Sequence, residues 1–151
     1  MLTTSLNSTS FSPKIQLAHQ LAKMFHKGQI YGDASTDYYS YHICGVLQLI
    51  QVHDLPEEYQ ISTILHDIVE DTTVTLDTIR NLFGDEVGDA VDALTKRPGE
   101  HVDSYMVRCN SNEIARIVKL HDSMFNAVNC AKNKNKIKYN TYLKKLSSLT
   151  M

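Results

Sequence analysis

Four residues of the types that bind metals or transfer protons lie within one short segment of this chain: His66, Asp67, Glu70 and Asp71. Apolar residues of the same segment recur at helical spacing: Ile61, Ile64, Leu65 and Ile68. This spacing predicts a helix whose buried stripe leaves the polar residues on another arc, with His66-Asp67 in mid-helix and Glu70-Asp71 one turn later. Three carboxylates this close repel one another and lose hydration unless a cation lies among them. The pattern therefore indicates a divalent metal site.

Other helices must supply the remaining ligands of such a site. His42 begins one expected helix, although a single histidine there is more often a cap or a surface residue. Asp122 lies at the edge of the buried stripe of another helix, with Asn126 four residues later. An acid that close to a core face needs a partner. A salt bridge to Lys119 and metal coordination both satisfy this need, and the sequence leaves the two open.

Helical periodicity covers nearly the whole chain, and no convincing alternating strand is present. Ser12-Pro13 is a helix start, and the segment from Asp54 to Glu57 is typical of a capping box that begins the His66-Asp67 helix. Asp54 then has a structural role, so the second His-Asp pair of the chain, His53-Asp54, is not assigned to chemistry. In chain order, the expected helices cover about 13–27, 42–51, 55–71, 76–83, 85–94, 102–108, 112–131 and 136–149. The fold class is all-α: a compact single-domain helical bundle at 13–149, after a disordered or frayed start at 1–12.

Composition limits the classes of protein that fit. With 151 residues, 42% of them hydrophobic, and a net charge of −2, the chain can bury a real core and has no overall charge that favours nucleic acid or membrane binding. Six lysines and no acid follow residue 122, which leaves nine basic against 17 acidic residues in the range 1–122. The basic tail could cover an anionic ligand or form a solvated helix face. Three separated cysteines, no apolar run of membrane-spanning length and no signal-peptide pattern make a reducing cytoplasm the expected location.

Several stretches together resemble the HD superfamily of metal-dependent phosphohydrolases, and within it the small single-domain homologues of RelA/SpoT hydrolase domains. The resemblance covers roughly residues 15–145 and rests on an ordered set of His, His-Asp, Glu-Asp, Asp and Asn. It is carried by the following stretches: Ala18 to Gln29, Tyr39 to His42, Leu65 to Asp71, Phe83-Gly84, Leu94 to Glu100 and Val118 to Asn126.

The resemblance implies a role for each of these residues. The metal ligands would be His42, His66, Asp67 and Asp122, holding one Mn²⁺, which histidine and carboxylate ligands suit. Glu70 and Asp71 would be the acid–base pair, and Asn126 would contact the substrate. The implied reaction removes the 3′-pyrophosphate of guanosine tetra- or pentaphosphate, giving GDP or GTP and pyrophosphate. A metal lowers the pKa of bound water, and a carboxyl group with a raised pKa can protonate a leaving oxygen. The sequence does not separate the roles of Glu70 and Asp71.

The chain departs from the family pattern in the residues that would hold the nucleotide. An Arg-Lys pair usually follows the Gly-Gln motif, whereas Gln29 is followed here by Ile-Tyr-Gly-Asp, and Ser123 replaces a common arginine. Tyrosines of this loop could stack on a base, or they could simply pack. Lys138 and Tyr142, or Tyr139 in a competing alignment, correspond to a basic residue and a tyrosine that the family presents to the nucleotide. Lys96 is a further candidate phosphate contact.

Three functional hypotheses remain open. The first is a Mn²⁺-dependent alarmone 3′-pyrophosphohydrolase that acts on a small nucleotide, without a membrane or nucleic-acid partner. The second keeps the chemistry but changes the substrate to an adenine alarmone, NADPH or another phosphorylated nucleotide. The third is a nucleotide-binding module with an inactive site, which the complete set of ligands disfavours. The sequence leaves open whether the chain forms a homo-oligomer.

Overall fold

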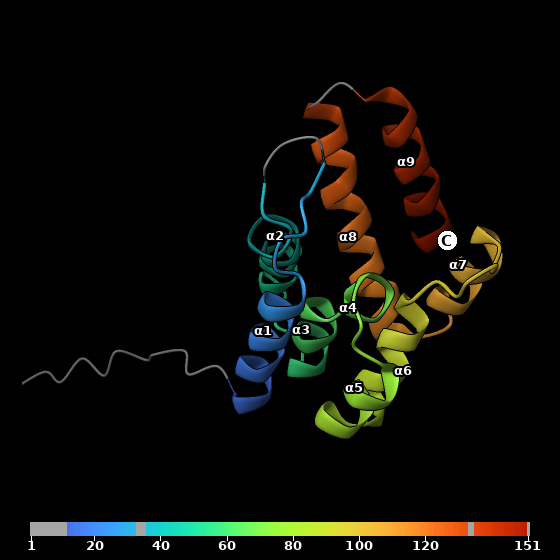
Figure 1. The fold of residues 1–151 in the computed structure, drawn as a ribbon. Helices are drawn as coiled ribbons and strands as arrows, with labels where there is room; N and C mark the ends of the chain where they lie inside the picture. The colour runs from blue at the N-terminus through green and yellow to red at the C-terminus, as the bar shows by residue number, and fades with distance from the viewer. Residues whose placement is uncertain (1–11, 33–35, 133–134, 151) are drawn as a thin grey trace, which may run out of the picture.

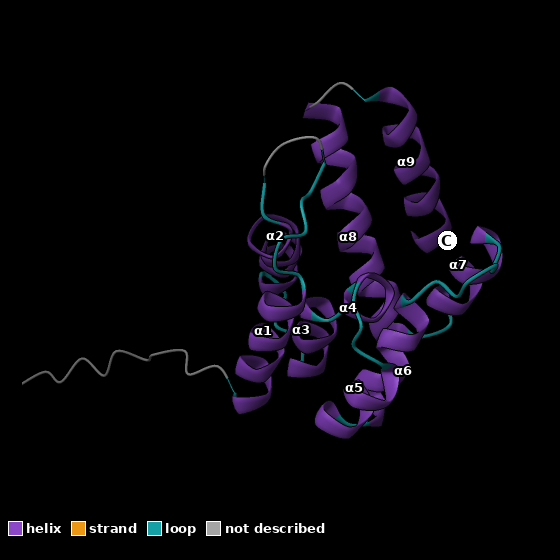
Figure 2. Ribbon diagram, in the orientation of Figure 1, coloured by secondary structure: helices purple, strands orange, loops and turns teal. Residues whose placement is uncertain are grey.

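The computed structural model describes residues 12–32, 36–132 and 135–150, and almost all of the regular structure in these ranges is helical (Figure 2). Its only extended pairing there is an isolated antiparallel bridge between Ile30 and Asp37. The elements are as follows: α1 Pro13–Phe25, a π-helical segment η1 Tyr39–Ile43, α2 Cys44–Gln51, α3 Glu57–Ile64, α4 Ile68–Asp71, α5 Leu76–Phe83, α6 Asp85–Leu94, α7 Val102–Asn110, α8 Glu113–Lys132 and α9 Lys136–Thr150. The predicted all-α fold is confirmed. The expected disordered or frayed start falls on residues 1–11, which lie outside the described ranges.

Helix α8 runs through the middle of the bundle and contacts α2, α3, α6, α7 and α9 (Figure 1). Helix α9 runs back along α8 in the opposite direction, so its C-terminal end approaches α7. Helices α1, α2 and α3 lie on the other side of α8. None of the described helices is both long and apolar enough to cross a membrane.

Two clusters of buried side chains form the core. One joins α1, η1 and α2 to α3, α4, α5 and α6, and its most enclosed members include Ile61, Ile64 and Ile68. The other joins the end of α6 to α7, α8 and the last turns of α9, where Leu149 is only 2% exposed. The helical stripe predicted at 61–68 therefore lies in the first cluster, directly beneath the predicted site.

Several helix ends follow the signals in the sequence. The Ser12 side chain accepts the amide of Ile15, and the Thr75 side chain accepts the amide of Thr78, so both are N-caps. Gly84 ends α5 with φ of +93°, a conformation that residues with a Cβ rarely adopt. These ends set the lengths of the helices that carry the site.

Two predictions about helix continuity are wrong. His66 and Asp67 do not lie in mid-helix: α3 ends at Ile64, residues 65–67 form a turn, and α4 begins at Ile68. Apolar spacing continues through the turn because Leu65 and Ile68 are both fully buried, and this hides the break from a periodicity analysis. Asp54 is also not a cap, since the helix begins at Glu57 without a side-chain cap.

The physical reason for the missing capping box is a turn before the helix. The amide of Leu55 donates to the carbonyl of His53, and Pro56, with φ of −53° and ψ of 155°, is the residue that precedes the first helical position. Glu57 and Glu58 in the first turn then interact favourably with the positive end of the helix dipole. The pair His53-Asp54 still has a structural role although Asp54 is not a cap, because the ring of His53 packs edge-on against the ring of His121.

Candidate metal centre and the cavity beside it

Three separate parts of the fold bring two histidines and two aspartates together. His42 comes from η1, His66 and Asp67 from the turn between α3 and α4, and Asp122 from α8. His42 Nε2 lies 3.0 Å from Asp122 Oδ1 and 3.7 Å from Asp67 Oδ2. His66 Nε2 lies 3.0 Å from Asp67 Oδ2 and 3.4 Å from Asp122 Oδ1. The four residues that sequence analysis picked as ligands, here called the ligand cluster, therefore lie together, with the Nε2 atom of each histidine near one oxygen of each aspartate.

The chemistry of the ligand cluster fits a divalent cation. The Nδ1–H group of His66 donates to the carbonyl of Thr63 over 2.6 Å, so the lone pair of a neutral ring lies on Nε2 and faces two carboxylate oxygens. That contact is repulsive unless a cation lies between the groups. His42, His66 and Asp122 offer ligand atoms that all lie within 4.8 Å of one another and could hold a metal ion. A backbone carbonyl that orients a histidine ring is a common support for a metal ligand.

The electrostatics of the cluster point the same way. Burial alone would lower the pKa of His66, but the attraction of Asp67 and Asp122 outweighs it and raises that pKa well above its ordinary value. Burial alone would raise the pKa of Asp67, but the charge and hydrogen bond of His66 lower it well below its ordinary value. Without a metal, a proton on His66 thus serves as the cation that the two carboxylates need.

Of the two alternatives for Asp122, the salt bridge to Lys119 is present at one carboxylate oxygen, and the other oxygen can serve as a metal ligand. Oδ1 faces His42 and His66, while Oδ2 accepts a hydrogen bond from Lys119 Nζ at 2.9 Å. Burial opposes ionisation of Asp122, yet Lys119 and the two histidines lower its pKa well below its ordinary value. Asp122 is only 4% exposed and Asn126 only 8%, so both are buried and do not merely border the buried stripe of α8.

Glu70 and Asp71 lie beside the ligand cluster on α4, each held by one hydrogen bond. Glu70 Oε1 accepts the backbone amide of Lys96 at 2.8 Å, and Asp71 Oδ2 accepts Gln29 Nε2 at 3.0 Å. Desolvation, with the nearby charge of Asp67 adding to it, raises the pKa of both carboxyl groups. Raised pKa values in two adjacent carboxyl groups are typical of groups that exchange protons near neutral pH.

Residues that the sequence did not single out hold these two acids in place. His26 Nδ1 contacts Gln29 Oε1 at 2.7 Å, which fixes the Gln29 amide so that its nitrogen faces Asp71. Arg108 holds the loop of Lys96, with hydrogen bonds to the carboxylate of Glu100 and to the carbonyl of Thr95. The sequence marked the Gly-Gln motif and the stretch from Leu94 to Glu100 as parts of a family pattern. It did not indicate that they form hydrogen bonds with Asp71 and Glu70 on α4.

A cavity of about 320 Å³ opens beside the ligand cluster, between α8 and α9. Of the residues predicted to bind substrate, Asn126, Lys138 and Tyr142 line this cavity, together with His42, Asp67 and Asp122. The remaining lining residues are Tyr31, Gly32, Tyr38, Lys119, Asn129, Cys130 and Lys145. Lys96 is not among them, and the structure links it to the site only through its backbone amide.

Two tyrosines of the loop before η1 cover the ligand cluster. The ring of Tyr31 stacks on His42 with centroids 5.1 Å apart, and its hydroxyl donates to Asn126 Oδ1 at 2.5 Å. Asn126 Nδ2 in turn donates to Asp122 Oδ1 at 3.1 Å. The hydroxyl of Tyr38 donates to Asp67 Oδ2. These loop tyrosines therefore pack and also contact the site, and their hydrogen bonds to Asn126 and Asp67 were not expected from the sequence.

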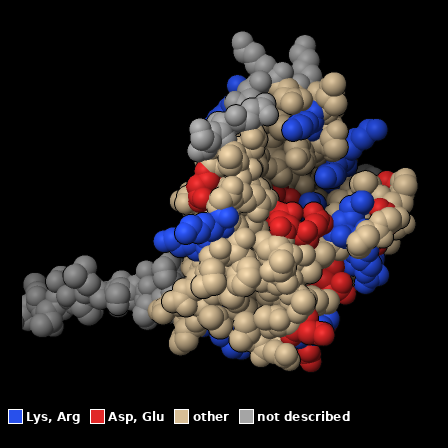
Figure 3. Space-filling model, viewed as in Figure 1, with Lys and Arg blue, Asp and Glu red and all other residues tan. Residues whose placement is uncertain are grey.

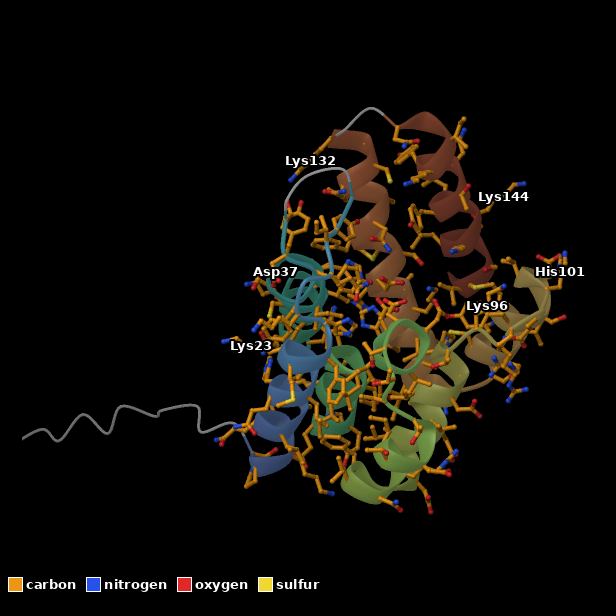
Figure 4. All side chains as sticks on the ribbon, viewed as in Figure 1. Lys23, Asp37, Lys96, His101, Lys132 and Lys144 are labelled. Carbon is orange, nitrogen blue, oxygen red and sulfur yellow. The ribbon has the colours of Figure 1, made fainter. Side chains whose placement is uncertain are left out.

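The charges on the visible face agree with this arrangement. Acidic side chains gather in a hollow near the centre of the view, and Lys and Arg side chains lie along its right-hand side (Figure 3). Lys96 lies on that side, between α6 and the C-terminal end of α9 (Figure 4). Basic and acidic side chains are thus neighbours on this face of the molecule.

A family model described as the HD domain matches residues 18–119 of this chain. Curated relatives are named GTP pyrophosphokinase or probable GTP pyrophosphokinase. The Streptomyces antibioticus protein is 32% identical over 127 residues, which is 78% of this chain and 15% of the relative. The Mycobacterium leprae protein is 35% identical over 82 residues, and the Brucella melitensis protein is 38% identical over 79 residues; each match covers 10% of the relative. This chain therefore spans only a small part of the length of these relatives.

A solved structure shows the same fold. It belongs to a metazoan orthologue of SpoT that hydrolyses ppGpp and plays a role in starvation responses. The two structures superpose with a TM-score of 0.80 at 22% identity, over 92% of this chain and 86% of the other. The arrangement of helices around the ligand cluster is thus shared with a protein of that description.

Proposed function

Because the chain belongs to the HD-domain family, we propose that it is a metal-dependent phosphohydrolase that removes the 3′-pyrophosphate of guanosine tetra- or pentaphosphate, with Mn²⁺ as its metal. The observation that carries the proposal is the ligand cluster with two hydrogen-bonded acids beside it and a cavity lined by Lys138 and Lys145. Such a site can hold a metal, a water molecule and a phosphate group together. That is the set of components that hydrolysis of a phosphate ester needs.

The protein residues have separate tasks in this proposal. His42, His66, Asp67 and Asp122 would hold the metal, which when bound supplies an activated water and neutralises phosphoryl charge. Glu70 and Asp71 form the acid–base pair, one accepting the proton of the attacking water and the other supplying a proton to the leaving oxygen. The hydrogen bonds from Lys96 and Gln29 hold the two carboxylates apart. Each acid can therefore serve a different partner.

The proposed substrate contacts are Asn126, Lys96, Lys138 and Tyr142. Tyr142 is half-buried in the cavity wall and offers a ring on which a base can stack, while Lys138 offers a charge for a phosphate group. Two kinds of relative support a guanosine substrate: the curated proteins are named for a GTP reaction, and the structural neighbour is described as hydrolysing ppGpp.

The experiment that tests the proposal is incubation of the purified protein with guanosine tetraphosphate and MnCl₂, with release of GDP and pyrophosphate as the readout. Replacing Asp67 by Ala should abolish release, because this substitution removes a ligand. The control is Asp54→Ala, which changes the exposed aspartate of the other His-Asp pair. No release by the wild-type protein, or equal release by the Asp67 variant, would contradict the proposal.

A second candidate substrate is another phosphorylated nucleotide, such as an adenine alarmone or NADPH. The observation that favours it is Tyr31, which faces the cavity from the loop where the family usually presents an Arg-Lys pair. A panel of nucleotides assayed for phosphate and pyrophosphate decides between the two, and turnover of guanosine alarmones alone excludes this candidate. Tight nucleotide binding without turnover at any metal would instead support an inactive binding module.

A further inference from the structure

Helix α9 presents three polar residues to the cavity, and one of them has no assigned role. Lys138, Tyr142 and Lys145 all line it, at spacings of four and three residues that place them on one face of the helix. Leu149 continues the same face and is buried in the second core cluster, which fixes this end of α9. Lys145 also lines a second cavity of about 520 Å³ between α7 and α9, so it stands between the two cavities.

The charge of Lys145 is poorly compensated by the protein. Among the described residues no carboxylate forms an ion pair with its ammonium group, which lies 5.2 Å from the centre of the Tyr142 ring. Desolvation, and after it the positive charge of Lys119, lower the pKa of Lys145. A half-buried cation that faces a second cation is unfavourable unless an anion occupies the space between them.

The position of Lys145 identifies where that anion would lie. Its ammonium group is close enough to Asp122, Glu70 and Asp67 for their negative charges to act on its pKa. Helix α9 starts beside the C-terminal end of α8, where the amide of Asn135 donates to the carbonyl of Cys130, and runs back along α8 towards Asp122 and Lys119. The separation of seven positions between the two lysines corresponds to about 10 Å along the helix. Lys145 is therefore at the end of the cavity next to the ligand cluster and the acid pair, and Lys138 is at the far end.

We propose that Lys145 is a further phosphate-binding residue, whose ammonium group contacts the pyrophosphate-type anion held at the ligand cluster. The inference rests on the proposed function for the nature of the anion, while the need for an anion rests on the cavity and its uncompensated lysine. Lys145 neutralises the side of the phosphate group that faces away from the carboxylates. The far lysine, Lys138, remains available to a second phosphate group of the same ligand.

The test is the binding of inorganic pyrophosphate, measured by titration calorimetry at one fixed MnCl₂ concentration. Lys145→Met removes the charge but keeps most of the side-chain volume that separates the two cavities. We expect about tenfold weaker binding, which corresponds to about 1.4 kcal/mol. Lys145→Arg should recover binding to within about threefold, because the charge returns.

The chain offers a matched control in the neighbouring lysine. Lys144 points away from α8 and lines the cavity between α7 and α9 but not the cavity beside the ligand cluster (Figure 4). Lys144→Met makes the same change in net charge on the same helix, and it should bind pyrophosphate within about twofold of the wild-type protein. Thermal unfolding of each variant checks that the fold is intact, and Lys145→Gln replaces the Met variant if that one does not fold.

The outcomes separate this inference from the proposed function. Equal binding by the Lys145 and Lys144 variants, or no pyrophosphate binding by the wild-type protein, overturns the inference. Binding that depends on Lys145 in a protein that does not hydrolyse guanosine tetraphosphate supports the inference and contradicts the proposed function. Hydrolysis without any loss of pyrophosphate binding in Lys145→Met supports the proposed function and overturns the inference.

Discussion

The two sides of the cavity differ in how their charges are compensated. On the α8 side, each oxygen of Asp122 has a neighbour, with His42 on Oδ1 and Lys119 on Oδ2. On the α9 side, the ammonium groups of Lys138 and Lys145 form no ion pair among the described residues. On the α8 side, the charges have partners within the protein before any substrate binds, and only the metal ion would have to be added. The arrangement on the α9 side is complete only when an anion binds.

This difference separates two functions within one cavity. Buried charges that lose one partner are strongly destabilising, so the ligand cluster is tied to the stability of the fold. Charges on a partly exposed helix face contribute little to folding, so they can be exchanged as the ligand changes. We therefore expect the chemistry of the site to be fixed by η1, α8, α4 and the turn before α4, and the choice of nucleotide by α9 and the tyrosine loop.

The largest effect is expected at Asp122. Asp122→Ala removes a ligand and leaves the buried ammonium of Lys119 without its partner, which should lower the free energy of unfolding by about 3–5 kcal/mol. Asp122→Asn keeps an acceptor for Lys119 and should recover much of that stability, yet it should not recover turnover. Chemical denaturation and the pyrophosphate-release assay measure the two effects. If Asp122→Ala kept wild-type stability and activity, the proposed difference between the α8 side and the α9 side of the cavity would be wrong.

The next largest effect concerns the acid pair. Glu70→Gln and Asp71→Asn should each lower kcat by about 10²–10⁴-fold, because each removes a group that transfers a proton. The bound metal content, measured on the purified proteins by elemental analysis, should remain that of the wild-type protein since neither residue belongs to the ligand cluster. Loss of metal in these variants would instead place the two acids among the ligands.

A smaller effect is expected at the far end of α9. Lys138→Met should raise KM by about three- to fivefold without a change in kcat, because an exposed charge contributes at most about 1 kcal/mol. Its melting temperature should equal that of the wild-type protein, in contrast to the result for Asp122→Ala. Steady-state kinetics and thermal unfolding on the same preparation provide both values. A large loss of stability would show that α9 is part of the structural framework of the site.

The smallest effect is a dependence of stability on pH. Desolvation and the charges of Asp67 and Asp71 raise the pKa of Glu70 above its unfolded value, so its contribution to stability is present at low pH and is lost as pH rises through the folded pKa. Glu70→Gln does not titrate, so the metal-free variant should melt about 1–3 °C higher than the wild-type protein at pH 7.5. This advantage should shrink steadily towards pH 5. A variant that melts at a lower temperature than the wild-type protein at pH 7.5 would contradict the raised pKa of Glu70.

The residues of the ligand cluster could be chosen from sequence because their types and order are informative by themselves. His42, His66, Asp67 and Asp122 all converge, although they come from three parts of the chain. The break of the helix at His66 could not be predicted. Buried residues on both sides of the turn, Leu65 and Ile68, continue a helical period through a segment that is not helical.

The contacts that orient the site were out of reach for a different reason. Tyr31 and Asn126 are 95 residues apart, and no local pattern indicates that the two side chains meet. Gln29 and Asp71 are 42 residues apart, and only the Gly-Gln motif marked the first of them. Lys145 was within reach, because it lies seven residues after Lys138 and three after Tyr142 on the same helix face.

Helix α4 is a single turn, and such a short helix does not persist without tertiary support. Ile68 is the one buried residue of the four, and partly buried Val69 packs against the same core cluster, so two aliphatic side chains anchor the segment that carries both Glu70 and Asp71. A trimming substitution such as Ile68→Val would leave every polar atom of the active region untouched. The carboxyl groups that transfer protons would then be held less firmly in position. We therefore expect kcat to fall although the melting temperature of the domain, measured by calorimetry, changes little.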